Sequence, residues 1–267
     1  MFSNLTCCVT TRRDLPGKTP VLGVLKLDAD YTPVQGDISY PGSYSYKVCF
    51  RILKDLTPEM CESGNITNEV KQEIVDAVKY LEGQGVTGIT GNCGFLLRFQ
   101  TFVREYTSKP VFLSSLLQLS AITCAYDREE KVAIFTGSKS TLATMREAIR
   151  KECGVDYASS RYVVVECSAI PGYDSIRKCE KVDEQQIEEG IVKKALQVAR
   201  EQPLLVAILM EAAEMPPYSD AVRAATGLPV FDSITCANFF IKGFTSAEGF
   251  GLSSIQDSLP SRDAKLS

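Results

Sequence analysis

One spacing occurs twice in this chain, and it limits the folds that the chain can adopt. Cys93 is followed 17 residues later by Pro110-Val111-Phe112, and Ala212 is followed 17 residues later by Pro229-Val230-Phe231. In both places a short apolar run precedes the motif, and an amphipathic stretch precedes that run. A phrase repeated at a fixed spacing is typical of an internal repeat. The sequence therefore predicts two similar halves in which Cys93 and Ala212 hold equivalent positions.

Apolar runs and amphipathic stretches alternate through both halves. The apolar runs predict strands over residues 21–25, 48–53, 86–90, 110–113, 132–135, 162–165, 204–209 and 228–231. The amphipathic stretches predict helices over residues 68–82, 94–104, 114–123, 141–151, 183–200, 219–225 and 233–241. Apolar strands between helices indicate parallel sheets covered on both faces. We therefore expect an α/β fold made of two pseudo-symmetric lobes, each with a parallel sheet.

The charged stretch at 127–130 predicts the boundary between the lobes. We expect residues 20–125 and about 232–255 to form the first lobe and residues 126–231 the second, with flexible ends at 1–19 and 256–267. Ligands of such sheets lie beyond the carboxyl ends of the strands. Cys93 and Ala212 both fall at such ends, so we expect them to face one cleft that holds the active site.

Composition excludes several classes of protein. A formal net charge of −4 argues against an electrostatic nucleic-acid binder. No apolar run approaches the roughly 20 residues of a membrane span, and the first 20 residues lack the apolar core of a secretory signal. We expect a protein of the cytoplasm or an organelle that is not secreted and has no membrane or nucleic-acid partner.

Ten cysteines and no histidine restrict the available chemistry. A zinc site would require four scattered thiols to converge, since there is no CxxC pair and no imidazole. We expect no metal and no cofactor, and most of the cysteines to be reduced, buried thiols. Proton transfer near neutral pH must then use a thiolate, a carboxylate, a lysine or a tyrosine.

Cys93 is the strongest candidate for a reactive group. It stands between Asn92 and Gly94, at a predicted strand end and helix start, where backbone N–H groups favour a thiolate and can hold a carboxylate. A lone cysteine in such a turn is more often a buried structural residue, but its position in the repeat favours catalysis. We expect Cys93 to be the most readily alkylated thiol of the cleft.

Two segments resemble a known superfamily. Residues 91–94 and 211–221, together with 224–232, are similar to the aspartate/glutamate racemase superfamily, and the resemblance extends over roughly residues 20 to 250. The segment 36–48, rich in tyrosine and glycine, looks like that of the algal and coral dimethylsulfoniopropionate lyases. The resemblance implies a racemase-like fold and a cofactor-independent carbon–sulfur lyase. In that family a cysteine removes the α-proton, and the substrate splits into dimethyl sulfide and acrylate.

The same resemblance assigns roles to particular residues. The family has a cysteine at both motif positions; Cys93 matches the first, and Ala212 departs from the second, where the family has its base. The substrate carries a carboxylate and a sulfonium cation, and aromatic faces suit such a cation. The expected substrate-binding residues are Tyr31, Tyr40, Tyr44 and Phe95 for the cation, Thr136 and Ser138 for the carboxylate, and Asn92, Gly94, Ala213 and Glu214 beside the catalytic positions.

Two other functions remain open on sequence alone. One is a racemase that acts on aspartate, glutamate or a hydantoin, and the other is a ligand-binding relative without catalysis. A racemase pocket should offer oxygen acceptors to an ammonium group, whereas the tyrosine-rich segment suits a cation that cannot donate hydrogen bonds. In every case we expect a small-molecule substrate or ligand and a homo-oligomer, either a dimer or a tetramer.

Overall fold

The computed structural model describes residues 19–30, 32–173 and 183–245. Most of the two expected flexible ends, and Tyr31 with them, therefore lie outside the described residues.

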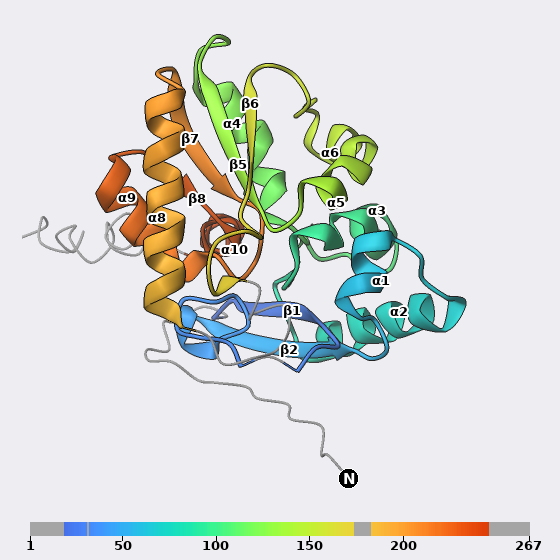
Figure 1. Ribbon diagram of the computed structural model, residues 1–267. Helices are drawn as coiled ribbons and strands as arrows, with labels where there is room; N and C mark the ends of the chain where they lie inside the picture. The colour runs from blue at the N-terminus through green and yellow to red at the C-terminus, as the bar shows by residue number, and fades with distance from the viewer. Residues whose placement is uncertain (1–18, 31, 174–182, 246–267) are drawn as a thin grey trace, which may run out of the picture.

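Two four-stranded parallel sheets form the framework, one in each half of the molecule (Figure 1). The first has the strand order β2-β1-β3-β4 and the second the order β6-β5-β7-β8. The strands are β1 (Val21–Leu27), β2 (Lys47–Leu53), β3 (Gly88–Gly91), β4 (Val111–Phe112), β5 (Lys131–Thr136), β6 (Tyr162–Glu166), β7 (Leu205–Met210) and β8 (Val230–Phe231). The predicted α/β fold with two parallel sheets is confirmed.

The two sheets also repeat each other in register. Ile89 of β3 pairs with Val111 of β4, and Ile208 of β7 pairs with Val230 of β8. The residue offset between these two pairs equals the offset between Cys93 and Ala212. The internal repeat read from the sequence is therefore a repeat of strand pairing, and positions 93 and 212 are structural equivalents.

The helices follow the predicted pattern, with shorter segments in places. They are α1 (Pro58–Ser63), α2 (Asn68–Gly83), α3 (Gln100–Arg104), α4 (Leu119–Ala125), α5 (Lys139–Thr144), α6 (Arg146–Cys153), α8 (Glu184–Glu201), α9 (Ser219–Thr226) and α10 (Ser233–Lys242). In the described residues four 3-10 segments accompany them: η1 (Pro41–Ser43), η2 (Gly94–Phe99), η3 (Ser115–Gln118) and η4 (Pro216–Tyr218). The predicted helix 94–104 thus begins as η2, and the helix predicted over 114–123 begins as η3.

Helix α1 was absent from the sequence prediction. Its start is marked by Thr57, whose side chain accepts a hydrogen bond from the Met60 N–H, and by Pro58 in the first turn. It ends at Gly64, which has φ 75° in the left-handed region that glycine tolerates. These end signals enclose only six residues, too few for a helical stripe to be recognised.

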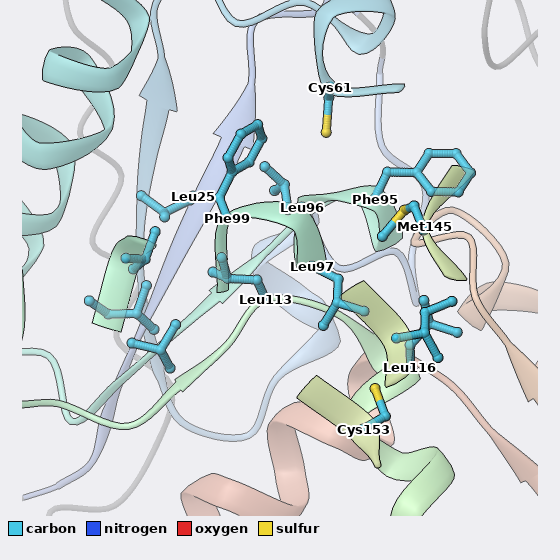
Figure 2. Packing of buried hydrophobic residues seen from close by; sticks show 14 of the residues in the cluster. Leu25, Cys61, Phe95, Leu96, Leu97, Phe99, Leu113, Leu116, Met145 and Cys153 are labelled. Carbon is cyan, nitrogen blue, oxygen red and sulfur yellow. The ribbon is translucent and has the colours of Figure 1, made fainter. Parts of the chain in front are cut away.

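Each sheet buries both faces because its side chains alternate. In β1, Leu22 and Val24 pack with Cys236 and Ile241 of α10, whereas Leu25 packs in the cluster that contains α2. The α2 cluster continues through η2 to α6 and includes residues of the second sheet (Figure 2). Helix α8 covers the other face of the second sheet, where a separate cluster lies. One core therefore extends across both halves and holds them together.

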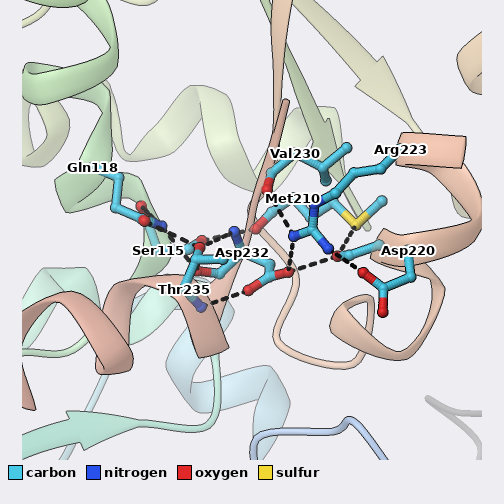
Figure 3. A network of polar contacts seen from close by, with 9 residues as sticks. Ser115, Gln118, Met210, Asp220, Arg223, Val230, Asp232 and Thr235 are labelled. Carbon is cyan, nitrogen blue, oxygen red and sulfur yellow. Dashed lines mark hydrogen bonds and ion pairs between the residues drawn. The ribbon is translucent and has the colours of Figure 1, made fainter. Parts of the chain in front are cut away.

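A buried carboxylate reinforces this connection at the start of α10 (Figure 3). Asp232 is 2% exposed and forms a capping box with Thr235. Its Oδ2 accepts a hydrogen bond from Ser219 (2.6 Å), and its backbone carbonyl accepts one from Gln118 Nε2 (2.8 Å). Since Gln118 belongs to η3 and Ser219 to α9, Asp232 connects the first half to the second.

Within the described part of the chain, none of the helices combines the length and the apolar character required to cross a membrane.

Candidate active site

The two repeated motifs touch each other where the sheets end. A β-carbon built on Gly94 would lie 1.9 Å from Oε1 of Glu211 and 2.5 Å from the Glu211 carbonyl oxygen. Nearby, the Ser115 hydroxyl donates a hydrogen bond to the carbonyl of Met210 at 2.8 Å. We call this contact between residues 92–95 and 211–214 the junction. Only glycine at position 94 permits an approach this close.

Cys93 lies on the partly exposed side of the junction. Its thiol has a pKa well above the ordinary value because of a hydrogen bond with Cys61, burial, and the nearby charge of Glu211. The N–H of Phe95 acts in the opposite direction and is outweighed. The predicted thiolate is therefore wrong. The predicted α-helix at this end is a 3-10 segment, and the missed helix α1 brings Cys61 against the thiol.

Asn92 occupies a buried position with both ends of its amide hydrogen-bonded. Its Oδ1 accepts from the Leu27 N–H at 2.8 Å, and its Nδ2 donates to the Ser39 hydroxyl at 3.3 Å. It therefore fixes the end of β1 and the tyrosine-rich segment relative to Cys93.

Glu211 holds the equivalent position in the second half. It is 1% exposed, and its Oε2 accepts a hydrogen bond from the Thr136 hydroxyl at 2.8 Å. Its Oε1 is buried without a hydrogen-bond partner. Burial raises the pKa of Glu211 to about 8; the Thr136 bond opposes this rise, and the charges of Glu214 and Glu62 add to it. Sequence reasoning did not single out Glu211, although a glutamate directly after an apolar strand is a usable signal.

Glu214 accepts a hydrogen bond from the Tyr173 hydroxyl at 2.7 Å. Tyr173 is fully buried, and burial together with the Glu214 charge raises its pKa well above the ordinary value. The sequence offered no signal for Tyr173, because it lies between β6 and α8, outside the repeated motifs.

The remaining candidates are spread over the two halves. Thr136 reaches the junction through Glu211, while Ser138 caps α5 by accepting from the Thr141 N–H at 3.1 Å. Phe95 is 6% exposed and packs in the core cluster that includes Met145 (Figure 2).

Among the tyrosine candidates for the cation, Tyr44 packs with a residue of the junction. It is 4% exposed, belongs to the same cluster as Ala213, and donates its hydroxyl to the Ile38 carbonyl at 2.5 Å. Tyr40 is 37% exposed, and Tyr31 lies outside the described residues. The structure thus groups Asn92, Cys93, Gly94, Thr136 and the 212–214 segment and leaves Tyr40 at the surface.

Comparison with known proteins gives matches of two kinds. The chain is 47% identical over 238 residues to dimethylsulfoniopropionate lyase 3 of Emiliania huxleyi (strain CCMP1516), covering 87% of this chain and 62% of that protein. It is 44% identical over 247 residues to the dimethylsulfoniopropionate lyase of Durusdinium sp. clade D, covering 90% of this chain and 82% of that protein. The chain therefore spans less than two thirds of the length of the first relative. No family model matches it.

Solved structures with the same fold are far more distant in sequence. Unliganded arylmalonate decarboxylase has a TM-score of 0.56 at 14% identity, over 86% of this chain and 94% of that chain. Aspartate racemase from Picrophilus torridus has a TM-score of 0.50 at 17% identity, over 84% and 94%. At such identities the likeness concerns the fold alone: two lobes of racemase-like α/β structure.

Proposed function

The chain belongs to the dimethylsulfoniopropionate lyase family, and on that premise we propose that it splits dimethylsulfoniopropionate into dimethyl sulfide and acrylate at the junction. The observation that carries the proposal is 44% identity across 90% of this chain and 82% of a lyase of that name. The contact between the Cys93 loop and residues 211–214 supports the same site, because it brings proton-transferring groups together.

The reaction needs a base, a place for the carboxylate and a face for the sulfonium. A base removes the α-proton, the freed electron pair forms the carbon–carbon double bond, and the carbon–sulfur bond breaks with its pair leaving on sulfur. Backbone N–H groups after Cys93 and the Ser138 hydroxyl are our candidates for the carboxylate, together with Thr136 if its hydrogen turns away from Glu211, to which it donates in this structure. Tyr44 is our first candidate for the cation, since aromatic faces attract such groups by ~0.5–2 kcal/mol.

Cys93 suits the role of a proton donor in this scheme better than that of a base. Its raised pKa keeps the thiol neutral near pH 7, so it can donate a hydrogen bond to the substrate or return a proton. Position 212, where the family resemblance puts the base, carries only a methyl group. We therefore expect the chain to bind substrate and to turn it over slowly.

We also propose that the reaction requires no cofactor, that the protein is intracellular, and that it forms a dimer or tetramer. The seven cysteines that the structure describes are free thiols, which suits a reducing compartment. Phe239 and Phe244 at the end of α10 are 70% and 49% exposed, and apolar surface of this kind is suited to subunit contact. Light scattering during gel filtration would show the oligomeric state directly.

The test of the proposed activity is release of dimethyl sulfide into the headspace above purified protein and substrate under reducing conditions. We expect a signal above that of heat-treated protein, however slow. The alternative of a racemase is tested in the same preparation by the optical rotation of aspartate and glutamate solutions. Loss of rotation without any dimethyl sulfide would overturn the lyase proposal in favour of the racemase.

A further inference from the structure

Glu211 has an unused acceptor atom at the centre of the junction. Its Oε1 is buried without a hydrogen-bond partner, although its other oxygen is held by Thr136. A buried carboxylate oxygen without a hydrogen-bond partner is unfavourable for folding. This oxygen therefore lowers the stability of the folded chain. An unpaired buried acceptor calls for an explanation, and a catalytic role is one that fits its place beside Cys93.

The surroundings of Glu211 set its proton affinity. Burial and the negative charges of Glu62 on α1 and Glu214 after β7 raise its pKa to about 8, against the opposing hydrogen bond from Thr136. Cys93, Cys167 and Tyr173 also face it, and all three are weak acids that stay neutral near pH 7. A carboxyl group tuned upward in this way is matched to proton transfer near neutral pH, where both of its forms are populated.

The two repeat-equivalent positions, 93 and 212, do not offer a competing base. Ala212 has no proton acceptor, and Cys93 holds its proton tightly. Solvent reaches the junction at Cys93, which is partly exposed, whereas Ala212 is buried at 7% exposure. Glu211 directly precedes Ala212 in the chain, and its Oε1 lies against Gly94, the residue after Cys93.

We propose that Glu211 is the general base of this chain, and that its free carboxyl oxygen takes the α-proton of the substrate in place of the thiol that position 212 lacks. The proposal rests on the proposed lyase function. The ionised carboxylate accepts the α-proton, the carbon–hydrogen pair becomes the double bond of acrylate, and dimethyl sulfide leaves with the carbon–sulfur pair. Glu211 then releases its proton to solvent, which restores the starting state.

The decisive variant is Glu211→Gln, which keeps the size of the side chain and an oxygen for the Thr136 hydroxyl but cannot accept the proton. Two rates are measured on it: dimethyl sulfide release, and alkylation of Cys93 by iodoacetamide followed by mass mapping. We expect dimethyl sulfide release to fall at least about tenfold, since a positioned base is typically worth 10²–10⁴ in rate. Alkylation should become faster, because removing the Glu211 charge lowers the pKa of Cys93.

The two rates separate a base from a mere electrostatic neighbour. If Glu211 only held back a Cys93 thiolate base, both rates would rise together in Glu211→Gln, and our proposal would be overturned. An unchanged dimethyl sulfide rate would overturn it as well. Glu166→Gln, a glutamate at the exposed end of β6, is the matched control and should leave both rates near those of the parent.

Two further proteins complete the experiment. Ala212→Cys tests the lyase function itself, and Glu211→Gln/Ala212→Cys should keep most of the Ala212→Cys rate because the thiol then serves as base. If Ala212→Cys releases dimethyl sulfide and the parent releases none, Glu211 is not a base but the lyase function stands. If no variant releases any, the proposed function fails, and the role of Glu211 fails with it.

Thr136→Val keeps the proposal testable should Glu211→Gln not fold. The Thr136 hydrogen bond lowers the pKa of Glu211, so its loss should raise that pKa further. The rate of dimethyl sulfide release in the parent should rise with pH through about 8, the value for Glu211, as the carboxyl ionises. In Thr136→Val this rise should move to higher pH; an unmoved profile would overturn the assignment.

Discussion

Asn92 and Glu211 occupy equivalent places in the two halves, yet their side chains have different hydrogen bonding. Each donates its backbone N–H across the sheet, Asn92 to the Leu25 carbonyl at 3.0 Å and Glu211 to the Phe135 carbonyl at 2.8 Å. The Asn92 amide is hydrogen-bonded at both ends, whereas Glu211 keeps one oxygen free. The residue that follows differs too, being a cysteine in the first half and an alanine in the second.

This difference shows that equivalent positions of a repeated fold can carry different chemistry. In the first half, a satisfied amide positions a thiol that stays protonated. In the second half, the backbone repeats in register, but the polar group is a carboxyl with one unpaired oxygen rather than a structural amide. The fold supplies two equivalent strand ends, and side-chain chemistry alone makes one of them a candidate proton donor and the other a candidate acceptor.

Making the two halves chemically alike should have the largest effect. Ala212→Cys gives both strand ends a thiol, and we expect dimethyl sulfide release to rise by at least about 100-fold, the lower end of what a positioned base contributes. Substrate affinity should change little, because the substitution adds one sulfur atom beside a partly exposed position. Headspace assays of both proteins under reducing conditions give the ratio.

The control for this variant is Ala224→Cys, which adds a thiol on the exposed surface of α9 in the same segment. It should leave the rate of dimethyl sulfide release unchanged. Equal rates for Ala212→Cys and the parent would refute the importance of position 212.

The free carboxyl of Glu211 should also affect stability in a way that Asn92 cannot. Its pKa is about 8 in the folded state and near 4.5 when unfolded, so between these values the folded state binds the extra proton. Its contribution is therefore fully present below about pH 4.5 and is lost as the pH rises through 8. Glu211→Gln removes the titration, and its stability relative to the parent should grow by on the order of a few kcal/mol from pH 5 to pH 8.

Urea unfolding of both proteins at several pH values measures that difference, since titrating groups that do not interact with Glu211 cancel in the subtraction. A difference independent of pH would mean that Glu211 ionises normally in the folded state. That result would remove the electrostatic basis of the contrast with Asn92.

Gly94→Ala should disrupt the close contact between the two halves at Glu211. The added β-carbon would meet both the carboxyl and the backbone carbonyl of Glu211, and a backbone atom cannot move aside cheaply. We expect the free energy of unfolding to fall by ~1–3 kcal/mol, as for other overpacked sites. Gly83→Ala at the end of α2, where no atom lies within 4 Å, should instead be neutral or slightly stabilising. Equal stabilities of the two variants would contradict the close contact.

The repeated framework was predictable because its signals are local. The runs around Ile89 and Ile208 and the Pro-Val-Phe phrases are visible in sequence, and their spacing carried over to strand register without change. Helix boundaries were harder where 3-10 turns begin a helix, as at Gly94, because such turns lack a distinct apolar period.

The electrostatics of the junction could not be predicted in the same way. Whether Cys93 ionises depends on Cys61, which lies on a helix too short to recognise, and on Glu211, which belongs to the other half of the chain. Likewise Phe95 looked like a binding residue because of its neighbours in sequence, but its ring packs in the core beside Met145 (Figure 2). Contacts between distant segments, rather than local pattern, decide both cases.

Cys61→Ala should have the smallest effect of these variants. It tests why the Cys93 thiol in the first half stays protonated. The hydrogen bond with Cys61 is the largest cause of the raised Cys93 pKa, so its removal should lower that pKa and release more thiolate. A hydrogen bond contributes ~0.5–1.5 kcal/mol net, which corresponds to about two- to tenfold faster alkylation of Cys93 at pH 8. Cys124, which is exposed, should still react before Cys93 and serves as the internal standard.

The matched control is Cys153→Ala, which removes a buried thiol from α6 in the same core cluster, away from Cys61 in the view of Figure 2. Both variants lose a buried sulfur and should be destabilised by similar amounts, but only Cys61→Ala should change the alkylation rate of Cys93. If both variants accelerate alkylation equally, the cause is general loosening of the core. If neither does, Cys61 is not what keeps the Cys93 thiol protonated, and the burial of Cys93 and the charge of Glu211 must account for it instead.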